Sequence, residues 1–120
     1  MLKGLGCDMI EVERIRQALS RPSFLRRVYT LEERAAIARK GAQTAAGFWA
    51  AKEAVSKALG TGFAQGIMPE QIEVTHADSG QPGARLTGAA QARLERMGGG
   101  RILLSLSHEG DTAIAFALIQ

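Results

Sequence analysis

Two carboxylates in apolar surroundings are the first candidates for chemistry in this sequence. Glu53 lies among alanines in the segment FWAAKEAVSKALG, and Lys57 follows one helical turn later. Asp8 lies in an apolar, strand-like segment, where an unpaired carboxylate is costly to bury. The two acids could hold a hard divalent cation such as Mg²⁺, with Lys57 neutralising phosphate charge. The alternatives are an exposed Glu53–Lys57 ion pair and a helix-capping role for Asp8.

A cluster of arginines is the second feature with chemical meaning. The segment from residue 14 to residue 27 contains no acid and carries Arg14, Arg16, Arg21, Arg26 and Arg27. Such a surface suits phosphates or an acidic partner, although a merely solvated face is the alternative. Binding of nucleic acid is not expected, because Tyr29 and Trp49 are isolated and cannot form a stacking platform.

Composition indicates one globular domain over residues 1–120. The chain is 46% hydrophobic and 22% charged, with a formal net charge of +3. No apolar run approaches a membrane span and no basic, then apolar leader opens the sequence, so we expect a cytoplasmic protein. The single cysteine, Cys7, cannot form an internal disulfide. We interpret it as a buried small hydrophobic residue in a strand rather than a catalytic thiol.

The local patterns predict an α+β fold with a mainly antiparallel sheet and helices packed on it. Predicted helices cover residues 12–20, ended by Pro22; residues 30–40, opened by a Thr30–Glu33 capping box; residues 44–59, ended by Gly60; and residues 89–97. Predicted strands cover residues 2–12, 72–78, 84–88, 101–108 and 112–120, the last two forming a hairpin.

The helix predicted over residues 44–59 has one clear core face. Phe48, Ala51, Val55, Ala58 and Leu59 fall on one stripe by helical spacing. Glu53 points roughly opposite, with Trp49 and Lys57 one turn before and after it and Ala50 and Ala54 at its flanks. We expect these small side chains to leave space for a ligand or another chain.

Two longer segments resemble the signature motifs of a known family. GCDMIEVERI, followed by FWAAKEAVSKALGTG, is similar to the motifs of holo-[acyl-carrier-protein] synthases, the small bacterial 4′-phosphopantetheinyl transferases. Asp8 and Glu53 occupy the two acid positions of that pattern. The resemblance continues through SFLRRVYTLEE, IEVTHADSGQPGARLTGAA and ILLSLSHEGDTAIAFALI, so it covers nearly the whole chain.

The resemblance implies an activity and a set of partners. The family moves the 4′-phosphopantetheine arm from coenzyme A to a serine of apo acyl carrier protein, an acidic protein, and releases adenosine 3′,5′-bisphosphate, in fatty acid biosynthesis. Members form trimers with active sites between subunits. Asp8 and Glu53 would bind Mg²⁺, Glu53 would also act as base directly or through water, and Lys57 would neutralise or protonate the leaving phosphate.

Further positions follow from the same resemblance. The implied coenzyme contacts are Lys52, Lys57, Gly80, Pro82, Ser107 and His108. Phe48 stands where many members carry a basic residue, so Arg39 and Lys40 are predicted to supply the nucleotide phosphate charge instead. Arg14, Arg21 and Arg27, with Phe24, are the implied carrier-docking residues. His76 matches no functional position and is taken as a surface residue.

Two other hypotheses stay open from the residues. One is a non-catalytic module that binds an acidic protein or nucleic acid through the arginines, for which Asp8 and Glu53 need not converge. The other is a coenzyme A-binding protein without transfer activity, which the retention of Asp8, Glu53 and Lys57 disfavours.

Overall fold

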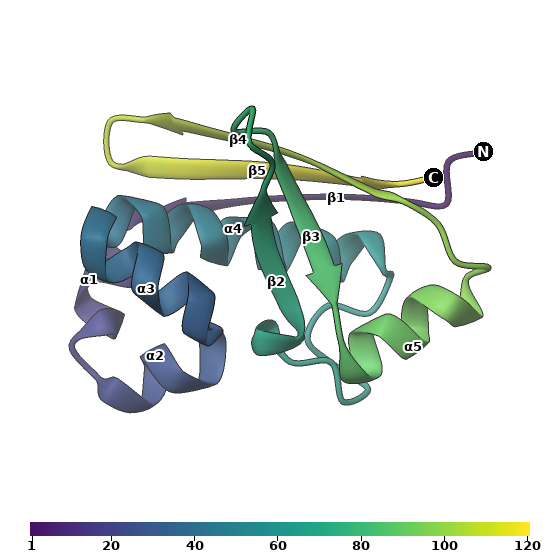
Figure 1. Ribbon diagram of the computed structural model, residues 1–120, viewed down its shortest axis with the longest axis horizontal. Helices are drawn as coiled ribbons and strands as arrows, with labels where there is room; N and C mark the ends of the chain where they lie inside the picture. The colour runs from purple at the N-terminus through teal and green to yellow at the C-terminus, as the bar shows by residue number, and fades with distance from the viewer.

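The computed structural model describes residues 1–120 and shows a sheet laid over one long helix (Figure 1). The elements in chain order are β1 (Gly4–Glu11), α1 (Val12–Leu19), α2 (Pro22–Val28), α3 (Leu31–Lys40), α4 (Ala42–Ala58), a 3₁₀ turn η1 (Pro69–Gln71), β2 (Ile72–His76), β3 (Pro82–Leu86), α5 (Gly88–Arg96), β4 (Ile102–Glu109) and β5 (Thr112–Ile119). No helix is both long and apolar enough to cross a membrane.

The strands form two antiparallel sheets rather than the single sheet expected. β5 lies between β1 and β4 in a three-stranded sheet, and β2 pairs with β3 in a separate hairpin. α4 runs along one face of the three-stranded sheet, and α1, α2 and α3 gather beside the first half of α4 (Figure 1). The α+β class and the β4–β5 hairpin are thus confirmed.

The helix predictions hold with one omission. The capping box at Thr30 forms in both directions, and Gly60 follows α4 with a φ of 83°. Pro22, however, begins α2 instead of only ending α1. Proline is tolerated at the first position of a helix because its missing N–H would have no intrahelical partner there.

The contact between β1 and α4 depends on two glycines. A Cβ atom placed on Gly6 would lie 2.0 Å from the carbonyl oxygen of Ala54, and one on Gly4 would lie 2.0 Å from that of Ala58. Ala50 and Ala54 are fully buried. The alanines therefore allow close packing against the rest of the fold, and the expectation that they leave space for a ligand is wrong.

The predicted core stripe of α4 is confirmed, because all five of its residues are buried. The opposite face of the three-stranded sheet has no helix on it, and large apolar side chains are exposed there. Leu5, Met9 and Phe116 are 62%, 67% and 52% exposed. Cys7 pairs with Phe116 in the register and is exposed as well, so the prediction of a buried cysteine is wrong.

Candidate active site

Asp8 and Lys57 meet where β1 lies along α4. The Lys57 Nζ is 3.4 Å from the Asp8 Oδ1 and donates a hydrogen bond of 3.0 Å to the Cys7 carbonyl. The Lys57 side chain is 51% exposed, whereas that of Asp8 is only 17% exposed. Lys57 is therefore anchored to the strand that carries Asp8 while its ammonium group still faces solvent.

Glu53 lies one helical turn before Lys57 and is half-buried. Burial raises the pKa of its carboxyl group, the charge of Asp8 raises it further, and Lys57 opposes both effects. The ionised Glu53 is thus repelled by the Asp8 carboxylate, and the positive charge of Lys57 offsets this repulsion only in part. An added cation between the two acids would relieve this repulsion.

The two carboxylates fit a hard divalent cation that takes its other ligands from water and substrate. Two carboxylates from different elements converge, and no group of three or more histidine, cysteine or acidic side chains gathers anywhere in the chain. Mg²⁺ is usually bound by one or two carboxylates together with waters and substrate phosphates. Asp8 and Glu53 could supply that pair.

A second group of the predicted site residues lines a basic pocket. It has a volume of about 300 Å³ between the end of α3, the first half of α4 and the end of β4. Its charged and aromatic lining residues are Arg39, Lys40, Phe48, His76 and His108. The ring of His108 faces Gly47, where an added Cβ would lie 3.4 Å from Nε2. The structure thus brings Arg39 and Lys40 together with His108.

Phe48 contributes an aromatic wall to this pocket and no charge. It is 5% exposed and its ring centroid lies 6.3 Å from that of His76. His76 is exposed at the end of β2. This confirms the expectation of a surface residue, although nothing in the sequence indicated that His76 also lines a pocket.

Ser107 and His108 do not share a pocket within one chain. Neighbouring residues of a strand point to opposite faces of the sheet. His108 faces α4, so Ser107 faces the uncovered side, opposite Ile114 in the register. Gly80 has a φ of 91° in the β2–β3 turn, and Pro82 lines a different hollow with His76 and Arg101.

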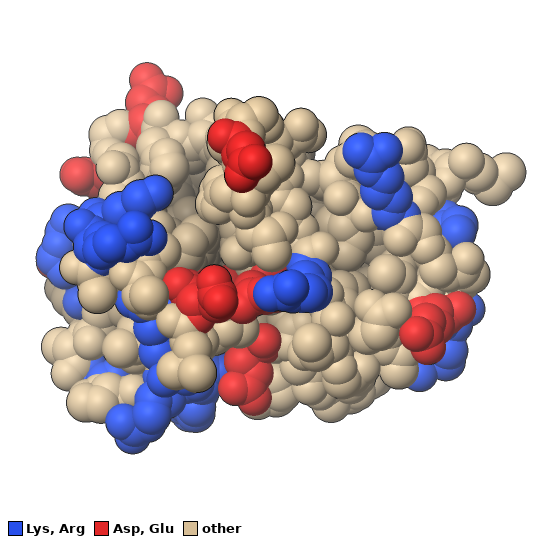
Figure 2. Space-filling model, viewed as in Figure 1, with Lys and Arg blue, Asp and Glu red and all other residues tan.

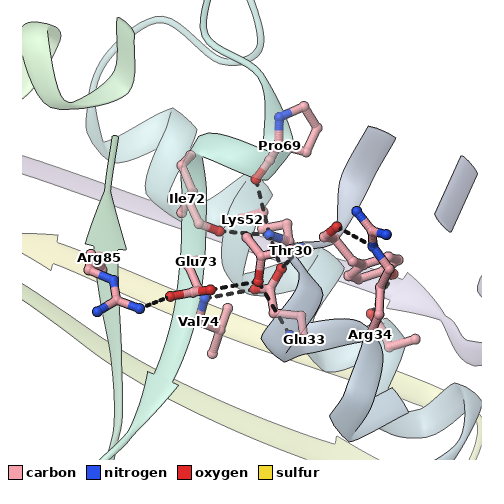
Figure 3. Close-up of polar contacts among 11 residues, drawn as sticks. Thr30, Glu33, Arg34, Lys52, Pro69, Ile72, Glu73, Val74 and Arg85 are labelled. Carbon is pink, nitrogen blue, oxygen red and sulfur yellow. Dashed lines mark hydrogen bonds and ion pairs between the residues drawn. The ribbon is translucent and has the colours of Figure 1, made fainter. Parts of the chain in front are cut away.

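Lys52 has a structural role that sequence reasoning did not predict. It is fully buried and donates to Glu33 at 2.7 Å and to the carbonyl oxygens of Ile72 and Pro69 at 2.7 and 3.0 Å (Figure 3). Glu33 also accepts from the Val74 N–H at 2.8 Å. Since its three donors are all used, Lys52 is not available to coenzyme A, and that predicted contact is withdrawn.

The arginine cluster borders an apolar pocket. Arg14, Arg21, Phe24 and Trp49 line a hollow of about 300 Å³ with residues of α1. Arg27 does not line it and instead donates to the Ser23 carbonyl. Figure 2 shows Lys and Arg side chains gathered over the helical end of the molecule. The surface therefore combines an apolar depression with positive charge at its rim.

The basic pocket and the carboxylates lie on different sides of α4. Phe48 and Glu53 are five residues apart, which places them about 140° apart around a helix of about 100° per residue. Asp8 and Lys57 lie on the β1 side, and β1 and β4 are the two opposite edges of the three-stranded sheet. One chain does not bring the two groups into one cavity.

Comparison with known proteins decides the family. The family model described as the 4′-phosphopantetheinyl transferase superfamily matches residues 4–117. A holo-[acyl-carrier-protein] synthase of Solidesulfovibrio magneticus is 43% identical over 122 residues, covering 100% of this chain and 99% of that protein. One of Clostridium acetobutylicum is 42% identical and covers 100% and 98%. This chain belongs to the holo-[acyl-carrier-protein] synthase family.

Solved structures of the family match over the whole chain. The holo-[acyl-carrier-protein] synthase of Neisseria meningitidis has a TM-score of 0.90 at 33% identity and covers 100% of this chain and 99% of its own. That of Bacillus anthracis, solved in complex with CoA (3′,5′-ADP), has a TM-score of 0.82 at 33% identity and covers 99% and 96%. The resemblance seen in the sequence is confirmed.

Proposed function

We propose that this protein transfers 4′-phosphopantetheine from coenzyme A to a serine of an apo acyl carrier protein. The full-length match to holo-[acyl-carrier-protein] synthases carries the proposal. The convergence of Asp8, Glu53 and Lys57 at one place supports it. The likeness to a synthase solved in complex with CoA (3′,5′-ADP) supports the choice of phosphopantetheine donor.

In the proposed step, the serine oxygen of the carrier attacks the β-phosphorus of coenzyme A. The bond from that phosphorus to the bridging oxygen breaks, and adenosine 3′,5′-bisphosphate leaves with the bond's electron pair. Glu53, a half-buried carboxylate beside Lys57, accepts the serine proton directly or through a water. Lys57 stabilises the negative charge on the leaving phosphate from its solvent-facing position.

Asp8 and Glu53 would hold Mg²⁺, which would neutralise charge on the diphosphate of the substrate. The mutual repulsion of the two carboxylates supports this assignment, since a cation lowers its cost. Glu53 then has two duties, so the protein must keep one carboxylate oxygen free for the proton.

The nucleotide half of coenzyme A would bind in the basic pocket, where Arg39, Lys40 and His108 face its phosphate groups. This pocket and the carboxylates lie on different sides of α4 and on opposite edges of the sheet. A coenzyme that reaches both would therefore span two chains. The exposed apolar face of Leu5, Met9 and Phe116 supports self-association into the homotrimer that we propose.

The carrier protein would dock on the pocket bordered by Arg14 and Arg21. An acidic helix complements the arginines, and an apolar side chain of the carrier would fill the depression beside Phe24 and Trp49. We further propose that the protein serves fatty acid biosynthesis in the cytoplasm.

A transfer assay tests the function directly. The protein is incubated with coenzyme A, Mg²⁺ and an apo acyl carrier protein, and the carrier's mass is measured before and after. We expect the mass to rise by one phosphopantetheine group, and the reaction to stop when chelator removes the metal. An unchanged carrier, with coenzyme A bound to the protein, would instead identify a binding protein without transfer activity.

Docking is tested by charge reversal. Arg14→Glu should raise the KM for the carrier at least about tenfold with little effect on coenzyme A, because opposed charges steer and hold the complex. The matched control is Arg96→Glu, an exposed arginine on α5 outside the depression. Equal increases of the KM for the carrier in both variants would contradict the docking surface.

A further inference from the structure

The walls of the basic pocket belong to elements that lie far apart in the sequence. The lining residues come from the second half of α3, the first half of α4, the end of β2 and β4. The pocket therefore keeps its shape only if these elements keep their spacing.

One buried ion pair joins three of these elements (Figure 3). Lys52 of α4 donates to Glu33 of α3 at 2.7 Å. Its other two hydrogen bonds go to the carbonyl oxygens of Ile72, at the start of β2, and of Pro69, in η1. The second carboxylate oxygen of Glu33 accepts from the Val74 N–H of β2 at 2.8 Å. The pair thus ties α3 and α4 to each other and both of them to β2.

The ion pair lies close to the pocket in each element. Phe48 lines the pocket one helical turn before Lys52, and His76 lines it two residues after Val74, on the same face of β2. Glu33 borders a neighbouring hollow that shares lining residues of α3, α4 and β2 with the pocket. A change of spacing at the ion pair would therefore move the pocket walls.

Stability alone does not explain why this pair is buried. Removal of two charges from water is costly, and apolar residues in place of a buried ion pair are often as stable or more so. Burial lowers the pKa of Lys52 and outweighs the opposing effect of Glu33, so the charged lysine is less stable here than in water. An ammonium group with three N–H donors supplies what an apolar contact lacks, because it holds each acceptor at a fixed distance and direction.

We propose that Glu33 and Lys52 are positioning residues, whose buried ion pair sets the spacing of α3, α4 and β2 and thereby the affinity of the basic pocket for the nucleotide half of coenzyme A. This inference rests on the proposed function of the same site. Neither residue lines the pocket, so neither touches the coenzyme. Their effect passes through the placement of Arg39 and Lys40.

The decisive variant combines Glu33→Gln with Lys52→Met. Lys52→Met alone leaves a buried charge without its partner, whereas the double variant removes both charges and should be the more stable of the two. Urea unfolding measures stability, and calorimetry measures the binding of adenosine 3′,5′-bisphosphate. We expect the folded double variant to bind at least about tenfold more weakly than the wild type, because displaced groups meet the phosphates poorly. Recovery of wild-type affinity along with the fold would overturn the proposal.

Transfer kinetics separate positioning from general damage. The double variant should show a KM for coenzyme A raised by at least about tenfold, with kcat at saturating coenzyme close to that of the wild type. Asp8 and Lys57 meet on another side of α4 and should keep their contact. The control is Leu94→Ala, which truncates a core residue of α5 at the other end of the molecule and should lower stability without changing the KM (Figure 1). An equal rise of the KM in this control, or a lower kcat with an unchanged KM in the double variant, would contradict the positioning role.

A milder pair of variants leaves the buried charges in place. The Thr30 hydroxyl donates to Glu73 of β2 at 2.6 Å and accepts from the Glu33 N–H at 3.3 Å, so it also joins the start of α3 to β2. Thr30→Val should weaken the binding of adenosine 3′,5′-bisphosphate about threefold, whereas Thr30→Ser keeps the hydroxyl and should bind like the wild type. If the double variant does not fold, this comparison decides, and equal affinities of the two Thr30 variants would refute the positioning role.

Failure of the positioning role differs from failure of the function. If the wild type binds no adenosine 3′,5′-bisphosphate and leaves the carrier unmodified, the proposed function fails. If the wild type modifies the carrier and the double variant keeps the wild-type affinity, only the role of Glu33 and Lys52 fails.

Discussion

The carboxyl group of Glu53 is less stable in its ionised form than an ordinary glutamate. Burial is the largest cause, the charge of Asp8 adds to it, and Lys57 compensates in part, so its pKa lies above the ordinary 4.5. A carboxyl group with a raised pKa in the folded state stabilises the fold only while it is protonated. That contribution is present below the unfolded pKa and is lost as the pH rises through the folded one.

The variant Glu53→Gln should therefore be more stable than the wild type at neutral pH in the absence of metal. The difference should shrink as the pH falls through the raised folded-state pKa and should nearly vanish below about 4.5, where the wild-type residue is protonated in both states. Urea unfolding at pH 7 and at pH 4 measures both. The exposed Glu109→Gln is the control and should show no such pattern, whereas a Glu53→Gln protein less stable at pH 7 would contradict the repulsion with Asp8.

At the scale of elements, α4 connects the parts of the candidate site. Its periodicity was enough to predict the core stripe, because apolar side chains at helical spacing leave few other interpretations. The roles of Lys52 and the alanines could not be predicted in this way. A lysine in a helix is normally exposed, and burial of Lys52 depends on Glu33 and on carbonyls of residues 69 and 72, which only the tertiary fold brings near. The small side chains of the alanines would let a ligand approach the helix as closely as β1 does, so the sequence could not distinguish the two.

Lys52→Met should destabilise the fold strongly. It leaves the buried Glu33 without its cationic partner, and removal of one member of a buried pair costs about 3–5 kcal/mol. Lys57→Met removes an exposed lysine from the same helix and should change the unfolding free energy by less than about 1 kcal/mol. Denaturant unfolding of both variants checks the contrast. Similarly small losses of unfolding free energy in the two variants would show that Glu33 finds other partners when Lys52 is absent.

The packing of β1 on α4 gives a second prediction for elements. Gly6→Ala places a methyl group against the Ala54 carbonyl, so strand and helix must separate and Asp8 must move away from Glu53. We expect a loss of about 1–3 kcal/mol in stability together with loss of transfer activity. Gly47→Ala, inside the same helix and with ordinary space around its Cβ, should be as stable as the wild type or more so. Equal stability of the two variants would contradict the close contact.

At the scale of the whole molecule, the single chain does not bring the carboxylates and the basic pocket into one cavity. The carboxylates lie toward one edge of the three-stranded sheet and the basic pocket toward the other, both on the side of α4, while the opposite face of the sheet exposes Leu5, Met9 and Phe116. Periodicity predicted these strands, yet it could not distinguish a face buried in the monomer's core from one buried against another copy. In the homotrimer that we propose, a neighbouring copy would have to supply the pocket that meets one chain's carboxylates.

Shared sites make a prediction that no monomeric arrangement shares. Glu53→Gln and His108→Ala should each be inactive alone. If the protein forms the homotrimer that we propose, mixed trimers of the two variants contain sites in which an intact Glu53 meets an intact His108 of the neighbour. Random assembly of an equal mixture completes about one quarter of the interfaces, so activity should return to about that fraction of the wild type.

The two variants are co-expressed with different affinity tags, mixed trimers are verified by native mass spectrometry, and transfer is assayed. A mixture of Asp8→Asn and Glu53→Gln is the control. Those two residues act from the same chain, so no interface in that mixture carries both intact, and activity should stay absent. If verified mixed trimers of the first pair show no activity, Glu53 and His108 act from the same chain. In that case, exchange of subunits cannot combine an intact Glu53 with an intact His108 in one site.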